Sequence, residues 1–452
     1  MTETALDYPT ERTQIPPAQP VSHFSHHPVV ILSAKRVEGY ASVFPFTRLR
    51  PDIALRLVHL SDLHLGYRQY QRSTPRGINQ READVAQSFK RALDKVIELA
   101  PEMVVIAGDV FHQVRPTNTA ILHAYGQFAR LRAALPDTEI VMISGNHDTP
   151  RSTDTSSILR LYAPLGLHVV DGEAQSLDFP QLDLSVLAVP FSQNETVKLV
   201  PPGTRRFNVL VFHGVVEGML GPFASPQELW SPEIPQSDLY PSQWDYIALG
   251  HYHVYRQILP NLFYSGSLDY TSTNTWGDRI EEGLAGVPGK GIIEHDLETG
   301  KHTFHPIEPS REFVDLPPFS ARGLTTEEVN ERITIVVNSC RGGIDEKVVR
   351  LVVRDLPRHI TRQLDHRQLR EFRRRAMHFH LDPRRPEIIR SSGHGSPGRR
   401  PSLAEFVRDK LRERVIPPDV DREALVELGL RFLKDAEERE GASSEAAASV
   451  EG

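Results

Sequence analysis

The stretch LRLVHLSDLHLG, residues 55–66, joins an apolar run directly to two side chains of the kind that bind metal ions. Residues 55–60 have the length and apolar content of a buried strand. Asp62 and His64 follow two positions apart, and in an extended chain this spacing points both side chains the same way. The stretch therefore predicts a strand whose end presents two ligands to one ion.

Four further apolar runs end in a similar manner. Their endings are Gly108-Asp109, Gly145-Asn146-His147-Asp148, His213-Gly214 and Gly250-His251-Tyr252-His253. Open α/β sheets bind ligands at the carboxyl ends of their strands, and glycines suit tight turns that bring backbone and ligands close. Each fragment alone is weakly specific, but all five in this order predict one metal site. Aspartate, asparagine and histidine without cysteine suit Mn, Fe or Zn, and an oxygen-rich octahedral site favours Mn.

The segments around these endings alternate between strand and helix patterns, which predicts a layered α/β domain. We expect two packed mixed sheets flanked by helices. The predicted helices, marked by apolar residues at helical spacing, are Glu82–Ala100, Thr117–Leu135 and Ser156–Leu165. The predicted strands are Leu55–Leu60, Met103–Ala107, Glu139–Ile143, Leu184–Val189, Phe207–Phe212 and Tyr246–Leu249.

A second, smaller α/β domain is predicted over residues 311–389. Its expected strands are Phe313–Leu316, Val348–Val353 and Met377–Leu381, and its expected helices are Thr325–Asn338 and Ile360–Arg375. Residues 390–401 are rich in Gly, Ser, Pro and Arg and are predicted to form a linker.

Two short amphipathic helices are predicted within residues 402–440. Ser402 to Glu405 form a capping-box pattern at the start of the first helix, and the second begins near Asp421. The pair either docks on its own core or presents an apolar surface to a partner. Outside these units, residues 1–52 and 441–452 are interpreted as a disordered extension and tail, and residues 53–310 as the main domain.

The composition narrows the class of protein. A chain of 452 residues can form two or more domains. It holds no run near the roughly 20 apolar residues of a membrane span and no secretory signal pattern. The single cysteine, Cys340, excludes an internal disulfide framework and a zinc–cysteine site and fits a reducing cytosol. We therefore expect a cytoplasmic protein that does not enter a membrane.

The net charge of -7 argues weakly against nucleic acid as a partner, but the charge is unevenly distributed. Arginine is dense between Arg350 and Arg414. One interpretation is a solvated, salt-bridged surface. The other is a surface that contacts phosphates, because guanidinium forks match phosphate oxygens.

The five endings together resemble the calcineurin-like metallophosphoesterase superfamily, whose fold is an αββα sandwich. Three longer stretches resemble the SbcD-type DNA repair nucleases within it: His59 to Tyr67, Asp109-Val110-Phe111-His112 followed by Arg115-Pro116, and Tyr264-Ser265-Gly266-Ser267. The resemblance covers residues 55–310 closely and 311–440 loosely. In the looser part such proteins carry a DNA-facing cap and a helix pair that binds the coiled-coil ATPase SbcC. The extension at residues 1–52 and the arginine-rich linker depart from the family.

The resemblance implies a role for each site residue. One metal would be held by Asp62, His64, Asp109 and His253, and the second by Asp109, Asn146, His213 and His251. Asp109 would bridge the two ions. His147 would face the substrate and stabilise or protonate the leaving oxygen, Asp148 would fix the orientation of His147, and His112 would lie near the phosphate or simply cap a turn.

The implied activity is Mn-dependent exonuclease action on duplex DNA and endonuclease action on single strands, with two Mn²⁺ ions as cofactors. The implied partners are DNA, an SbcC-like ATPase and a second copy of the chain, with Thr117–Leu135 and Ser156–Leu165 as candidate interface helices whose apolar faces could equally be core. Two alternatives stay open. The first is a metallophosphoesterase acting on phosphoproteins, nucleotides or small phosphodiesters, and the second is an inactive scaffold that binds DNA ends.

Overall fold

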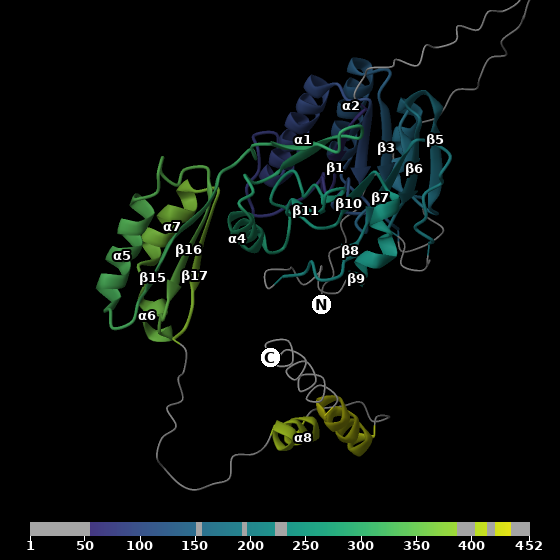
Figure 1. The fold of residues 1–452 in the computed structure, drawn as a ribbon. Helices are drawn as coiled ribbons and strands as arrows, with labels where there is room; N and C mark the ends of the chain where they lie inside the picture. Colours follow the sequence, from purple (N-terminus) through teal and green to yellow (C-terminus); the bar gives the residue numbers. More distant parts are fainter. Residues whose placement is uncertain are drawn as a thin grey trace, which may run out of the picture.

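The computed structural model describes residues 55–150, 156–191, 197–221, 233–386, 403–413 and 421–434. Two six-stranded sheets stack face to face in the main domain (Figure 1). The first sheet has the order β14-β13-β1-β2-β3-β4, and the second has the order β11-β12-β10-β7-β6-β5. The predicted α/β class with two packed mixed sheets is confirmed.

The first sheet is parallel from β1 to β4 and antiparallel at β13 and β14. In the second sheet β6, β7, β10 and β12 are parallel, and β5 and β11 pair antiparallel at the edges. The strands of the first sheet are β1 (Arg56–Leu60), β2 (Met103–Ala107), β3 (Glu139–Ile143), β4 (His168–Val170), β13 (Gly291–Asp296) and β14 (His302–Pro306); those of the second are β5 (Gln175–Phe179), β6 (Leu184–Val189), β7 (Phe207–His213), β10 (Tyr246–Gly250), β11 (Arg256–Leu259) and β12 (Leu262–Tyr264).

The apolar core lies on both faces of the first sheet. One face packs on the second sheet, where Val105 and Val141 meet Val209 and Ala248. The other face is covered by α1 (Gln80–Leu99), α2 (Asn118–Ala134) and the 3₁₀ segment η1 (Ile158–Leu165). The third predicted helix is a 3₁₀ segment and not an α-helix, and it ends one residue after Pro164.

The outer face of the second sheet packs against loops and 3₁₀ turns, including Leu239 and Trp244. The short segments here are η2 (Pro180–Leu182), η3 (Gln236–Leu239), η4 (Pro241–Gln243) and the strand pair β8 (Val215–Val216) and β9 (Glu233–Ile234). Helix α4 (Thr275–Ala285) follows β12 in the chain. These short elements were not predicted from the sequence.

A small domain follows, built on the parallel sheet β15-β16-β17. Its elements are β15 (Phe313–Ser320), α5 (Thr326–Asn338), β16 (Val348–Arg354), α6 (Arg358–Gln363), α7 (His366–Arg375) and β17 (His378–Pro383). The single helix predicted over Ile360–Arg375 is wrong: Asp365 accepts from the amides of Arg367 and Gln368 and starts α7 as a separate helix.

The C-terminal described segments are helix α8 (Leu403–Glu413) and a helix over residues 422–434. Asp421 accepts from the amides of Glu423 and Ala424 and so caps the second helix. The expected capping residue Ser402 and the predicted linker and tails lie outside the described residues. No described helix has the length and apolar character needed to cross a membrane.

Buried histidines between the sheets make the fold sensitive to acid. His59 Nδ1 lies 3.1 Å from the Tyr246 hydroxyl. His295 packs on the same tyrosine ring, and neither of its ring nitrogens has a hydrogen-bond partner among the described residues. Burial lowers the pKa of His59 to about 3 and that of His295 to about 4. Below pH 6.5 the unfolded chain therefore binds protons that the folded chain excludes.

We expect the protein to lose stability as the pH falls from 6.5 toward 4, and His295→Phe to reduce this loss. The substitution removes a group whose protonation favours the unfolded state. Urea unfolding at pH 8 and pH 5 measures the difference. The exposed His359→Phe serves as the control. If the free energy of unfolding depended equally on pH in His295→Phe and in the wild type, His295 would not be a source of the acid sensitivity.

Candidate metal centre

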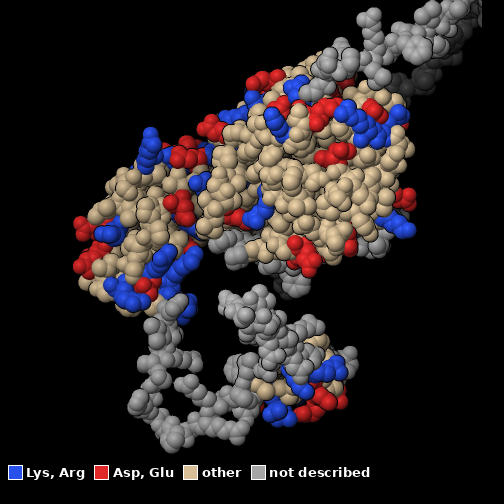
Figure 2. Space-filling model, viewed as in Figure 1, with Lys and Arg blue, Asp and Glu red and all other residues tan. Residues whose placement is uncertain are grey.

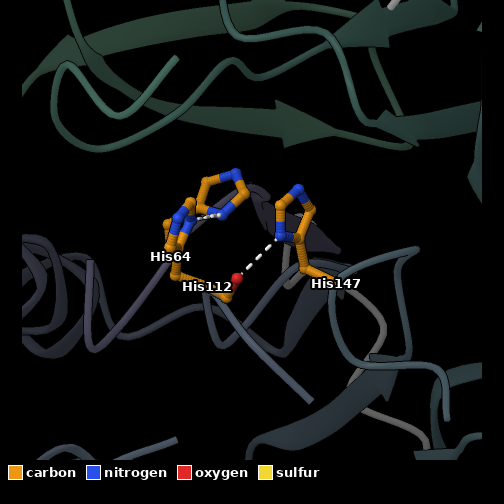
Figure 3. Close-up of side chains that lie close together, drawn as sticks. All are labelled: His64, His112 and His147. Atoms are coloured by element: carbon orange, nitrogen blue, oxygen red, sulfur yellow. Dashed lines mark hydrogen bonds between the residues drawn. The ribbon is translucent and has the colours of Figure 1, made fainter. Parts of the chain in front are cut away.

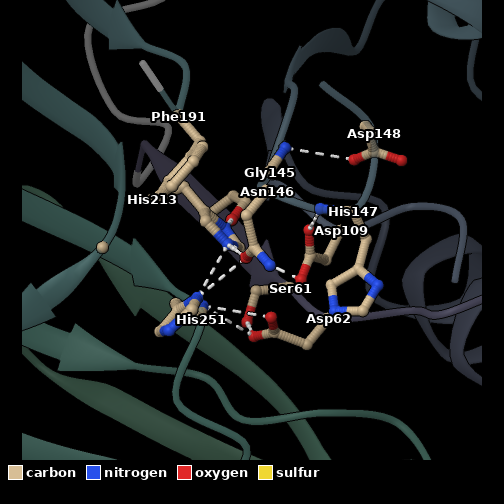
Figure 4. A network of polar contacts seen from close by, with 12 residues as sticks. Ser61, Asp62, Asp109, Gly145, Asn146, His147, Asp148, Phe191, His213 and His251 are labelled. Carbon is tan, nitrogen blue, oxygen red and sulfur yellow. Dashed lines mark hydrogen bonds and ion pairs between the residues drawn. The ribbon is translucent and has the colours of Figure 1, made fainter. Parts of the chain in front are cut away.

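Five loops at the carboxyl ends of β1, β2, β3, β7 and β10 converge at one edge of the stacked sheets (Figure 4). The loops after β1 and β2 continue to pair beyond the strands, since the Asp62 amide donates to the Gly108 carbonyl at 3.0 Å. Asp62, Asp109 and His251 have φ angles of 53°, 53° and 100°. Such angles are unfavourable for side-chain-bearing residues and persist where the surrounding structure fixes them.

The structure gathers the expected ligands into two groups. The first contains Asp62, His64 and His253, whose possible ligand atoms lie within 4.8 Å of one another. Within it, the Nε2 atoms of His64 and His253 are 3.0 Å apart. The second contains Asp109, His213 and His251.

Asn146 joins the second group through its side-chain oxygen. Its Oδ1 lies 3.0 Å from His213 Nε2 and 2.9 Å from His251 Nδ1. The two imidazole nitrogens are 3.3 Å apart. Ligand bonds of about 2.1 Å at octahedral or tetrahedral angles place neighbouring donors roughly 3.0–3.4 Å apart. These spacings fit one ion between the three side chains.

Asp109 lies between the groups. Its Oδ2 is 3.7 Å from His64 Nε2 in the first group and 3.6 Å from His213 Nε2 in the second. Its other oxygen accepts the His147 amide at 2.9 Å. One carboxylate can therefore serve ions on both sides, as the resemblance implies.

Burial keeps the imidazoles in the form that binds metal. It lowers the pKa of His213 and of His251 to about 3, and that of His64 and His253 well below the ordinary value. Neutral rings offer a lone pair to a cation. Burial also raises the pKa of Asp109, because an anion without water is costly. A set of buried carboxylates, amide oxygen and neutral imidazoles fits a divalent metal site.

The contacts behind the ligands fix their orientation. His213 Nδ1 donates to the Ala107 carbonyl at 2.8 Å, which leaves Nε2 facing the site. The Ser61 hydroxyl donates to Asp62 Oδ2 at 2.5 Å. The His251 amide donates to Asp62 Oδ1 at 3.0 Å. The backbone of one ligand thus orients the side chain of another.

A buried lysine supports His253 and was not found from the sequence. Lys290 Nζ donates to the His253 carbonyl at 2.8 Å and lies 2.9 Å from Glu282 and 3.5 Å from Asp278. Tyr270 closes this group, since its hydroxyl donates to Glu282 at 2.7 Å. No local motif marks Lys290, because its partners lie elsewhere in the chain: Asp278 and Glu282 are on α4, and His253 follows β10.

His147 and His112 lie beside His64 of the first group (Figure 3). His147 Nδ1 donates to the His112 carbonyl at 2.7 Å, and the two rings stack with centroids 5.1 Å apart. His112 Nδ1 is 3.4 Å from His64 Nδ1, and burial lowers the pKa of His112 to about 4. His147 is half-buried, so its free Nε2 can face a substrate.

The structure differs from the expected role of Asp148. Its carboxylate accepts from the amides of Val110, Phe111 and Gly145 at 3.0, 2.9 and 3.1 Å. The His147 ring is oriented by the His112 carbonyl instead. Burial and the neighbouring Asp109 raise the pKa of Asp148 to about 8, against the three amide donors that lower it. Asp148 therefore holds the loops after β2 and β3 together.

The candidate metal ligands lie within the part of the chain that matches a known family. Residues 55–259 match the family model of the calcineurin-like phosphoesterases. The chain is similar to the DNA double-strand break repair protein Mre11 of Methanococcus maripaludis, with 28% identity over 54% of this chain and 63% of the relative. It is also similar to the Mre11 proteins of Methanocaldococcus jannaschii, with 26% identity over 54% and 66%, and Methanosarcina mazei, with 25% identity over 69% and 54%. The chain therefore spans between about half and two thirds of these relatives' length.

We expect Asp109→Ala to abolish both metal binding and phosphodiester hydrolysis, because both groups lose their shared ligand. His147→Ala should keep its metal and lose hydrolysis, since His147 lies in neither of the two groups that Asp109 joins, although its ring nitrogens cluster with those of His64 and His112. Elemental analysis of the purified variants measures the metal content. Equal metal loss in both variants would contradict the assignment of Asp109 as the shared ligand and of His147 as a residue that does not hold the metal.

Proposed function

We propose that this chain, whose residues 55–259 form a calcineurin-like phosphoesterase domain, is a Mn-dependent DNA nuclease that hydrolyses phosphodiester bonds with two metal ions. The observation that carries the proposal is Asp109, a buried carboxylate within 3.7 Å of a histidine in each ligand group. The similarity to Mre11 proteins supports DNA as the substrate.

The chemistry follows from the residues present. When bound, two divalent ions neutralise the negative charge of a phosphodiester and make a water molecule nucleophilic at neutral pH. Asp62, His64 and His253 would hold one ion, and Asn146, His213 and His251 the other, with Asp109 shared. The mix of carboxylate, amide and imidazole ligands suits Mn, Fe or Zn, and we propose Mn²⁺ because of the oxygen ligands in the set.

His147 would supply a proton to the leaving oxygen. Its Nδ1 is committed to the His112 carbonyl at 2.7 Å, so the exchangeable proton lies on Nε2, on the opposite side of the ring. A deoxyribose oxygen is a poor leaving group, and a positioned acid of this type accelerates its departure by roughly 10²–10⁴-fold. The stacked His112 ring limits rotation of His147 and lies near the place of the phosphate.

We expect purified protein to shorten an end-labelled DNA duplex in Mn²⁺, and EDTA or His147→Ala to stop the reaction. Gel electrophoresis of the digestion products measures this. Turnover of a small chromogenic phosphodiester without DNA cutting would move the substrate to nucleotides or small phosphodiesters. DNA binding without hydrolysis of either substrate would favour the inactive scaffold.

A homodimer through α2 and η1 is part of the proposal. The two segments pack together, with the Tyr125 and Tyr162 rings 6.4 Å apart. Leu122, Tyr125 and Leu161 are 72%, 43% and 48% exposed. Three large apolar side chains exposed on adjoining segments favour burial against a second copy.

We expect Leu122→Glu to convert the dimer into monomers, because a charge would enter the apolar contact. Sedimentation at several protein concentrations measures the association. Leu284→Glu is the matched control, since Leu284 on α4 is 76% exposed and outside the proposed interface. A monomeric wild type, or a Leu122→Glu variant that still dimerises, would refute this interface.

The two C-terminal helices are proposed to bind a coiled-coil ATPase. Arg412 on α8 forms an ion pair with Glu423 on the second helix at 3.2 Å, so the two pack as a pair. Leu428 and Phe432 of the second helix are 40% and 63% exposed. An apolar face on a helix pair fits a helical partner.

Deleting residues 402–440 should remove ATPase binding and leave nuclease activity unchanged, because the metal centre lies entirely within the main domain. A pull-down with a coiled-coil ATPase of the SbcC type measures binding, and digestion of labelled duplex measures activity. Retained ATPase binding by the deletion variant would show that the contact lies elsewhere.

A further inference from the structure

The ring of His253 is held differently from that of His213. A histidine that binds a metal through one ring nitrogen usually donates from the other nitrogen to a protein acceptor, which fixes the ring. His213 follows this rule, since its Nδ1 donates to the Ala107 carbonyl at 2.8 Å. The Nε2 of His253 faces His64 at 3.0 Å, but its Nδ1 is buried and has no hydrogen-bond partner among the described residues. The position of the His253 ring therefore depends on the backbone that carries it.

The backbone carbonyl of His253 accepts hydrogen bonds from two other segments of the chain. Lys290 Nζ donates to it at 2.8 Å, and the Ser267 amide donates at 3.1 Å. The Ser267 hydroxyl is a third and longer donor at 3.3 Å. A hydrogen bond from a charged donor is roughly twice as strong as one between neutral groups. Because Lys290 is the charged donor of the three, it contributes most to holding this carbonyl.

Lys290 is itself fixed by helix α4. Charged side chains of both signs lie on the surface of the main domain (Figure 2), whereas Lys290, Asp278 and Glu282 are only 3%, 7% and 4% exposed. The two carboxylates are four residues apart on α4, so they share one face of the helix. Lys290 Nζ lies 2.9 Å from Glu282, 3.5 Å from Asp278 and 4.7 Å from the centre of the Tyr270 ring. These contacts leave the ammonium group little freedom to move.

Helix α4 also contacts the loop after β10 on both sides of His253. Glu281 of α4 accepts a hydrogen bond from the Tyr252 hydroxyl and another from Arg256 Nη2 at 2.6 Å. Tyr252 and Arg256 flank His253 in the sequence. Lys290 is the member of this support that reaches the backbone of the candidate ligand itself.

Loss of Lys290 would affect the two ligand groups unequally. His253 belongs only to the first group. In the second group, the ring of His213 is fixed by its own hydrogen bond, and the backbone of His251 is fixed by the bond from its amide to Asp62 at 3.0 Å. Neither contact involves Lys290. The second group can therefore keep its geometry when the lysine is removed.

We propose that Lys290 is a positioning residue for His253, and that it sets the affinity of the first metal ion without changing the affinity of the second. The proposal rests on the proposed two-metal nuclease function. Lys290 acts through the His253 carbonyl and not on the substrate. Replacing a residue that orients a metal ligand lowers metal affinity by about 10–100-fold. Without this lysine, the chain would hold one ion as tightly as before and the other weakly.

Two variants of the full-length chain test the proposal. Lys290→Met removes the donor and keeps an unbranched side chain, but it leaves two buried carboxylates without their cation, which destabilises the fold. The second variant therefore combines Lys290→Met with Asp278→Asn and Glu282→Gln, so that no buried charge of this group is left uncompensated. Both variants lack the charged donor to His253.

Lys347→Met is the matched control. Lys347 makes the same two kinds of contact in the small domain, since its Nζ donates to the Arg341 carbonyl at 2.8 Å and pairs with Glu312 at 2.6 Å. Equilibrium dialysis of metal-free protein against Mn²⁺ measures the two dissociation constants. Electron paramagnetic resonance distinguishes an isolated Mn²⁺ ion from a magnetically coupled pair. Turnover of a small chromogenic phosphodiester is followed over a range of Mn²⁺ concentrations.

We expect one dissociation constant to rise by about 10–100-fold in both Lys290 variants and the other to stay at the wild-type value. At limiting Mn²⁺ their spectrum should be that of an isolated ion, and turnover should be lost at low Mn²⁺ and restored at high Mn²⁺. The Lys347 control should match the wild type in all three measurements. A chain that is merely misfolded would lose both ions and would not be rescued by Mn²⁺.

Two unchanged dissociation constants in the combined variant, or an equal rise in both, would overturn the role of Lys290 and leave the nuclease proposal intact. A wild type that binds two Mn²⁺ ions but does not cut DNA would overturn the nuclease proposal, and selective loss of one ion in the variants would still support the role of Lys290. A wild type that binds a single Mn²⁺ ion would overturn both.

Discussion

The buried carboxylate of Asp109 is the constraint on which the rest of the site depends. Its oxygens approach His64, His213 and the His147 amide, so five loops must close around one anion. Such closure leaves no space for side chains on neighbouring turns. A Cβ on Gly145 would lie 2.1 Å from Asp109 Oδ1, and one on Gly250 would lie 1.8 Å from the Ala107 carbonyl. The glycines are needed for this close approach.

Metal binding and folding are coupled in such an arrangement. The Asp109 carboxylate is only 1% exposed and faces neutral imidazoles, so its negative charge is poorly solvated. Three of the ligand residues around it also have unfavourable positive φ angles. A divalent ion offsets both penalties, because it binds only the assembled site and so stabilises the folded chain.

The sequence predicts the parts of the structure whose cause is local. Strands β2, β3 and β6 begin and end as expected because each is an apolar run closed by polar turns, and Asp62 and His64 are marked by their spacing after β1. The half-exposed strand β14 lacks such a run. Lys290 lacks a motif because its role arises from tertiary contacts to His253 and Glu282. The hydrogen bonds of Asp148 also depend on how the loops after β2 and β3 meet in space.

Other tertiary contacts link the small domain to the metal ligands. Arg81, fully buried, contacts Asp84 at 3.3 Å and Asp269 at 2.7 Å, and Arg311 at the entry to the small domain reaches Asp84 at 2.7 Å. Removing one member of a buried ion network leaves an uncompensated charge, so its geometry resists change. Two residues before Asp269, the Ser267 amide donates to the His253 carbonyl at 3.1 Å. The short segment 267–269 therefore contacts both a candidate metal ligand and the ion network at the entry to the small domain. A shift of that domain can reach the metal centre through these ion pairs and one hydrogen bond.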